Sequence, residues 1–184
     1  GVVTVAEMLS VAAFDEGRYA QAFPSFGSER MGAPVVAFCR IDDREIRTRE
    51  PIAEPDALIV QDATLLHQVD LFSGLRPAGW IVINSSRTFD EVGVGALAAR
   101  FRHDRLLTVP ATELALRHIG RPIPNTVLLG GFCAASGIVS LAALEQAIRE
   151  RFTGETARGN VAAAREAHEW VASEMRELAD ATAD

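Results

Sequence analysis

The stretch from Tyr19 to Ile41 is YAQAFPSFGSERMGAPVVAFCRI. Its two ends are apolar and predict two strands, and the irregular connection between them, residues 24–34, is the unusual part. Consecutive strands are normally joined by roughly two to five polar residues. This connection is longer and contains Phe26, Met31, an acid, a base, two hydroxyls and two glycines. Because glycine permits another molecule to approach the backbone closely, we expect a binding surface here.

Length and composition bound the class of protein. The chain has 184 residues, 48% of them hydrophobic, which is enough for one domain with a substantial core. No linker, repeat or low-complexity segment interrupts it, so residues 1–184 are predicted to form a single domain. The formal net charge of -7 argues against nucleic acid or an anionic membrane surface as a partner. All 18 basic residues are arginines, which excludes Schiff-base chemistry and a phosphate loop of the lysine type.

The two cysteines, Cys39 and Cys133, each lie in an apolar run and are expected to be buried and reduced. Neither has a second Cys or a His at metal-ligand spacing, so we expect neither an iron–sulfur cluster nor a structural zinc on this chain. No apolar run reaches the roughly 20 residues of a membrane span, and the expected location is cytoplasmic. The sequence opens without Met, and a strand is expected to precede Gly1.

The first helix is predicted from a capping motif. Thr4 and Glu7 have the spacing of a capping box, apolar residues then recur at helical spacing, and Gly17 is a natural stop. The free N–H groups of such a first turn, next to Gly1, would form an anion site. The alternative is a plain turn that needs glycine.

Strands and helices alternate along most of the remaining chain. Buried strands are predicted at residues 35–41, 57–61, 80–84 and 105–109, with a short edge strand at 44–48. Helices are predicted at residues 64–72, 94–101, 111–118, 125–135, 140–151 and 159–179. This order predicts an α/β class: a three-layer α/β/α domain with a largely parallel sheet and a helical C-terminal third.

Two further features bear on binding and assembly. Asn84 lies at the carboxyl end of a predicted parallel strand, where ligands of open α/β sheets bind, although a turn and helix-cap role is the alternative. The small, apolar helix at residues 125–136 presents Gly130 and Gly131 for close packing. We take that face as a sign that the chain needs partners to stay soluble.

Four motifs occur in a recognisable order. They are GVVT at residues 1–4, FPSFGSERMGAPV at 23–35, EPDALIV at 54–60 and NTVLLGGFCAASGIVSLAAL at 125–144. They resemble the GGQGVVT turn, the FPxxGxERRGAPV segment, the EPD strand entry and the NxxxLGAxxxxTGIVSLEAL helix pair of one family. That family is the gamma subunit, or gamma domain, of the thiamine-diphosphate-dependent 2-oxoacid:ferredoxin oxidoreductases, which act on pyruvate, 2-ketoisovalerate or phenylglyoxylate. Two departures are Met31, where the family often has Arg, and the GGQ that would precede Gly1.

The resemblance implies a pyruvate synthase-like hetero-oligomer that oxidatively decarboxylates a 2-oxoacid to an acyl-CoA. In this family, alpha and beta subunits hold thiamine diphosphate with Mg, and iron–sulfur clusters, including those of a ferredoxin-like subunit, carry the electrons. The gamma subunit is thought to contribute to coenzyme A binding and to assembly. No catalytic residue is therefore expected on this chain, and its partners would be the alpha, beta and ferredoxin-like subunits together with coenzyme A.

The residues expected to contact coenzyme A lie at the first glycine turn, in the irregular connection at residues 24–34, or at the end of a predicted strand. They are Gly1, Thr4, Ser25, Phe26, Ser28, Arg30 and Asn84. Arginine suits phosphate through its bidentate fork, and hydroxyls add neutral donors. Three alternatives stay open: that Glu29 and Arg30 pair with a neighbouring subunit, that the chain is a stand-alone nucleotide-binding α/β module, and that it is purely structural. The glycine fingerprint of a dinucleotide-binding module is not seen after Gly1.

Overall fold

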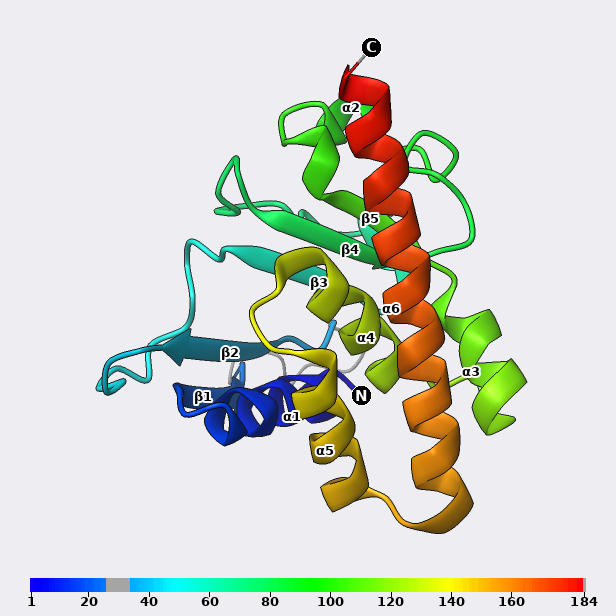
Figure 1. Cartoon of the computed structure of the whole chain (residues 1–184). Coiled ribbons are helices and arrows are strands. Elements are labelled where there is room, and N and C mark those ends of the chain that lie inside the picture. Colours follow the sequence, from blue (N-terminus) through cyan, green and yellow to red (C-terminus); the bar gives the residue numbers. More distant parts are fainter. Residues whose placement is uncertain (26–33, 184) are drawn as a thin grey trace.

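The computed structural model describes residues 1–25 and 34–183. In chain order its elements are α1 (Val2–Asp15), β1 (Tyr19–Pro24), β2 (Ala37–Asp42), β3 (Ala57–Val60), the 3-10 helix η1 (Ala63–His67), β4 (Trp80–Asn84), α2 (Gly95–Ala98), the 3-10 helix η2 (His103–Arg105), β5 (Leu106–Val109), α3 (Ala111–Ile119), α4 (Asn125–Ser136), α5 (Leu141–Arg151) and α6 (Gly154–Ala183). The long helix α6 extends from its hairpin with α5, past α4, to β5 (Figure 1).

A parallel sheet of order β3-β4-β5 forms the middle layer. Successive side chains of a strand point to opposite faces. In the central strand β4, Val82 accordingly packs with the helices, whereas Ile81 and Ile83 pack with η1 and the loops on the other face. All three are fully buried. The predicted α/β class, with a largely parallel sheet and a helical C-terminal third, is confirmed.

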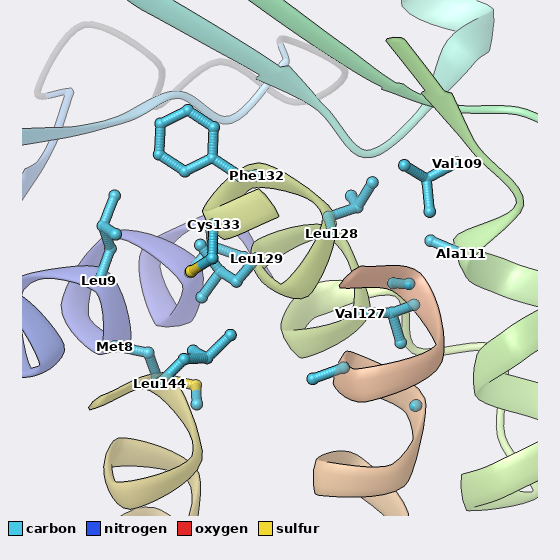
Figure 2. Packing of buried hydrophobic residues seen from close by; sticks show 14 of the residues in the cluster. Met8, Leu9, Val109, Ala111, Val127, Leu128, Leu129, Phe132, Cys133 and Leu144 are labelled. Carbon is cyan, nitrogen blue, oxygen red and sulfur yellow. The ribbon is translucent and has the colours of Figure 1, made fainter. Parts of the chain in front are cut away.

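Helix α4 is the centre of the helical layer. Leu128, Leu129 and Phe132 point from it toward α1, α5 and the sheet (Figure 2). Its close packing was predicted, but the partner is α6 of the same chain: a Cβ added at Gly130 would lie 2.2 Å from the carbonyl oxygen of Ala164. The inference that this face needs another subunit is therefore wrong.

The stretch from Tyr19 to Ile41 contains two strands, as predicted, but they do not join the parallel sheet. β1 and β2 form a separate antiparallel pair, with Phe23 opposite Phe38, and they pack against α1. The second strand was predicted to be covered on both faces, whereas its residues are half-buried or exposed. An apolar run with one large polar residue, Arg40, does not by itself distinguish a strand buried on one face from a strand buried on both.

Helix α6 covers the outer edge of the parallel sheet. β5 is an edge strand, and its Thr108 carbonyl accepts a hydrogen bond from Trp170 Nε1 at 3.2 Å. The Thr108 backbone also hydrogen-bonds to the carboxyl group of Glu174 on the same helix. Two side chains of α6 therefore engage the edge groups that a neighbouring strand would otherwise use.

Several predicted elements differ from the structure. The first helix begins at Val2 with Gly1 as its N-cap, so Thr4 and Glu7 are inside the helix and form no capping box. Residues 44–48 form no strand. The last helix begins at Gly154 and not at residue 159. Gly159 does not start the helix: it lies inside it, where a Cβ would lie 2.6 Å from the carbonyl oxygen of His118.

Candidate functional site

Seven residues were predicted to contact a ligand, and the structure describes four of them. Phe26, Ser28 and Arg30 belong to residues 26–33 and lie outside the described residues. The other four are Gly1, Thr4, Ser25 and Asn84. Gly1 and Thr4 lie at the N-terminus of α1, and Ser25 directly follows β1. Asn84 lies apart from them, at the carboxyl end of the parallel sheet.

The N-terminus of α1 has the geometry of an anion-binding helix end. Gly1 is exposed, and its carbonyl accepts the first helical hydrogen bond, from the Val5 N–H at 3.3 Å. The first N–H groups of a helix have no partner within it, and the helix dipole makes this end positive. No acidic side chain lies in the first turn. The end of α1 next to Gly1 can therefore accept a negative group.

Thr4 is engaged with a different element. Arg151, at the end of α5, donates to the Thr4 hydroxyl at 3.4 Å and to the Glu7 carboxylate at 3.2 Å. Arg151 thus ties α5 to one face of α1. Sequence reasoning missed this arginine, because its partners are more than 140 positions away and no local pattern links them.

Ser25 lies at the same end of this layer as Gly1. The 14 residues of α1 extend about 21 Å, and the six residues of β1, which run back along the helix, extend about 20 Å (Figure 1). The strand end therefore returns to the level of the first helical turn. The Ser25 N–H donates to the Val36 carbonyl at 2.9 Å, so the segment that connects these two residues begins and ends there.

Asn84 lies on the other sheet and connects three elements. Its Nδ2 donates to the Gln61 carbonyl at 3.0 Å and to the Thr112 hydroxyl at 2.8 Å. Its Oδ1 accepts from the Thr112 N–H at 3.2 Å, which makes it a cap on the first turn of α3. The alternative turn and cap role is thus present in the structure, and the amide is engaged on both sides.

Beside Asn84, Gln61 is a second candidate that sequence reasoning missed. It follows β3, and its Nε2 is buried without a hydrogen-bond partner among the described residues. A buried amide nitrogen without an acceptor is costly, so such a group marks a place where a ligand oxygen could bind. The signal was present in the sequence, since Gln61 and Asn84 end neighbouring parallel strands.

Neither cysteine is activated. Burial raises the pKa of Cys39 to about 12. Burial, with a smaller contribution from the charge of Glu16, raises the pKa of Cys133 to about 12. Both thiols are free and protonated at neutral pH, as expected for packing residues.

The described residues contain neither a metal-ligand cluster nor a membrane-spanning helix. Within residues 1–25 and 34–183, no group of three or more His, Cys, Asp or Glu side chains is placed to hold a metal ion. None of the helices in the same described part of the chain combines the length and apolarity that a membrane span requires.

Comparison with known proteins assigns the family. Residues 1–170 match the family model described as pyruvate ferredoxin/flavodoxin oxidoreductase. The chain is 46% identical over 169 residues to the pyruvate/ketoisovalerate oxidoreductases common subunit gamma of Thermococcus litoralis, covering 92% of this chain and 90% of that one. It is also 46% identical to the pyruvate synthase subunit PorC of Methanothermobacter thermautotrophicus, covering 92% of this chain and 88% of that one.

A solved structure gives the same result. The pyruvate oxidoreductase subunit PORC of Thermotoga maritima superposes with a TM-score of 0.75 at 35% identity, covering 92% of this chain and 89% of that one. Fold, motif order and sequence identity agree along nearly the whole length. The chain therefore belongs to the pyruvate ferredoxin/flavodoxin oxidoreductase family, and within it to the gamma subunits.

Proposed function

We propose that this chain acts within a cytoplasmic multi-subunit complex that converts a 2-oxoacid to an acyl-CoA, and that it contributes to coenzyme A binding and to assembly. The observation that carries the proposal is the match to gamma subunits over 92% of this chain and 90% of the relative. One such relative is named as a common subunit of pyruvate and ketoisovalerate oxidoreductases, which favours both substrate classes for the complex. Thiamine diphosphate, Mg and the iron–sulfur clusters are assigned by this proposal to the alpha, beta and ferredoxin-like partners.

The N-terminus of α1, together with Ser25 after β1, supports the coenzyme A role. Coenzyme A carries phosphate groups, and the N-terminus of α1 beside Gly1 offers N–H donors and a positive dipole. Ser25 directly follows β1 at the same level, and Arg30 follows it five positions later in the sequence. An arginine and a helix N-terminus together would bind a phosphate through charge-assisted hydrogen bonds.

Arg30→Ala tests the coenzyme A role. Loss of one charge-assisted hydrogen bond to phosphate costs on the order of 1.5–3 kcal/mol, or roughly 10- to 150-fold in affinity. We expect the apparent constant for coenzyme A to rise by that factor in the assembled complex. Oxidation of the 2-oxoacid by an artificial acceptor without coenzyme A should stay nearly unchanged. The rise in the coenzyme A constant should become smaller as ionic strength increases, because salt screens an exposed contact.

Arg44→Ala is the matched control, since it removes an exposed arginine that forms no ion pair within the described part of the chain. A rise in the constant for both variants would indicate a general charge effect. Loss of both half-reactions with dissociation of the complex on Arg30→Ala would assign Arg30 to a subunit contact. An intact complex with an unchanged coenzyme A constant would contradict both roles.

A further inference from the structure

A groove lies between α5 and α6, the helical hairpin at the bottom of Figure 1. Its volume is about 400 Å³. The lining consists of arginines and small apolar residues: Arg149, Ala157, Arg158, Val161, Ala162 and Arg165. On a chain with a formal net charge of -7, three arginines around one groove are a local reversal of sign.

Two carboxylates neutralise this lining only in part. Glu145, whose side chain is 11% exposed, accepts from Arg165 Nη2 at 3.0 Å and lies 3.6 Å from Arg149 Nη2. The hydrogen bond from Arg165 holds the pKa of Glu145 below its usual range, so this carboxylate stays ionised and keeps the two arginines in place. Arg158 has a 71% exposed side chain, and its one ion pair among the described residues is with Glu155 at 3.6 Å. The groove therefore keeps a surplus positive charge and guanidinium donors that face solvent.

The residues that line the groove favour an acidic peptide over a phosphate as the anionic ligand. A phosphate site normally adds hydroxyls to its arginines, and the residues that line this groove carry no hydroxyl. Instead the floor is apolar, with Ala157 and Val161 buried. A peptide segment that carries both carboxylates and aliphatic side chains satisfies the rim and the floor together.

From this charge complementarity we propose that the groove between α5 and α6 docks an acidic segment of a partner subunit, an inference that rests on the proposed function. Carboxylates of the segment would accept from Arg158 and Arg149 at the rim, and its aliphatic side chains would cover Ala157, Val161 and Ala162. Arg165 would stay paired with Glu145 and fix the wall of the groove.

Arg158→Glu in the co-expressed complex tests the proposal. The substitution should not impair folding, because the side chain is exposed and a carboxylate in the first turns of α6 is favoured by the helix dipole. We expect the dissociation constant of the chain from the complex, measured by sedimentation across a dilution series, to rise about 10-fold or more. The wild-type constant should rise with NaCl concentration, and that dependence should be weaker in the variant.

The matched control is Arg176→Glu, which makes the same change at an exposed position of the same helix, where the structure's described residues offer no ion pair. Thermal unfolding of both variants checks that they fold equally well. An unchanged dissociation constant for Arg158→Glu, or equal weakening by both variants, would overturn the proposal. A raised coenzyme A constant with intact assembly would overturn it too, by assigning the groove to a small anion. Failure of the wild-type complex to form acyl-CoA would instead reject the proposed function.

Discussion

Glu174 places a carboxyl group against the outer edge of β5, where one of its oxygens is buried without a hydrogen-bond partner among the described residues. Burial, and secondarily the charge of Glu177, raises the pKa of Glu174 to about 7. Because the folded-state pKa lies above the usual value of 4.5, ionisation favours the unfolded chain. Stability from this group is fully present below about pH 4.5 and declines as the pH rises through 7.

Glu174→Gln should therefore stabilise the chain at pH 8 and have little effect at pH 4.5. The gain at pH 8 should be on the order of 1 kcal/mol once solvent screening of this partly exposed group is allowed for. Chemical denaturation at the two pH values measures it. Glu169→Gln, which removes an exposed carboxylate from the same helix, is the control for loss of a charge. An equal effect of Glu174→Gln at both pH values would mean that ionisation of this carboxyl group is not linked to folding.

Asn84 gives a second prediction at the scale of one residue. Its amide hydrogen-bonds to Gln61 and to both the N–H and the hydroxyl of Thr112. Asn84→Ala would leave these partly buried groups unpaired, which should lower the free energy of unfolding by about 1–3 kcal/mol. Urea unfolding measures this loss. Kinetics of the complex then separate the two roles of Asn84: an unchanged coenzyme A constant leaves the cap on α3 as its only function.

Where α4 crosses α6, the packing determines whether a glycine of α4 can be replaced by a larger residue. At Gly130, a Cβ would meet the backbone of Ala164 at 2.2 Å, whereas at Gly131 it would meet methyl groups of Val109 and Val171 at 3.0 and 3.1 Å. Backbone cannot yield without moving a helix, but side-chain methyls can rotate or shift.

Gly130→Ala should therefore cost about 2 kcal/mol or more, even after the roughly 1 kcal/mol that alanine gains in a helix. Gly131→Ala should change stability by less than about 1 kcal/mol. Thermal or urea unfolding of the pair checks the order. The reverse order would show that α4 and α6 separate more readily than their packing indicates.

Much of this element-scale structure was predictable. Residues 80–84 were predicted as a strand with the observed bounds, because a continuous apolar run between a glycine turn and polar residues has few other solutions. The helix predicted at residues 140–151 is observed at Leu141–Arg151, and the Ser140 hydroxyl caps it by accepting from the Ala143 N–H. The sheet to which β2 belongs was not predictable, since pairing depends on contacts with α1 that no local pattern encodes.

The candidate site was less accessible to prediction than the fold. Thr4 and Glu7 have the spacing of a capping box but do not form one in the structure. The helix begins earlier, at Val2, and the Thr4 hydroxyl accepts a hydrogen bond from Arg151 instead. Gln61 and Arg151 became visible only when the strand ends and the α1–α5 contact were placed. Functional residues of this kind are defined by tertiary neighbours, and only the folded chain reveals them.

At the scale of the whole molecule, α1 presents an apolar surface to solvent. Phe14 is 72% exposed and Val11, one turn earlier, is 39% exposed. Neighbouring exposed apolar residues favour association. We expect the isolated chain to self-associate in sedimentation experiments as its concentration rises, and the Val11→Ser/Phe14→Ser variant to stay monomeric over a wider range. Leu116→Ser on α3, a single exposed apolar residue, is the control. Self-association that is unaffected by the double variant would assign the contact to another surface.

The isolated chain should also be inactive. As a gamma subunit that depends on its partners for thiamine chemistry under the proposed function, it should not oxidise pyruvate with an artificial electron acceptor. Turnover should appear only when the remaining subunits are added. Oxidation by the chain alone, after the purified sample is shown to contain no other subunit, would contradict the division of labour proposed for the complex.

The cover that α6 places over β5 has a consequence for how this molecule meets others. An open sheet edge is a template for strand addition, and strand addition is how cross-β polymers begin. At Thr108 the backbone groups are already held by Trp170 and Glu174. A neighbouring subunit on this side must therefore bind through side chains, and not by extending the sheet. A change that detaches the C-terminal turns of α6 would expose this edge of β5 to strand addition.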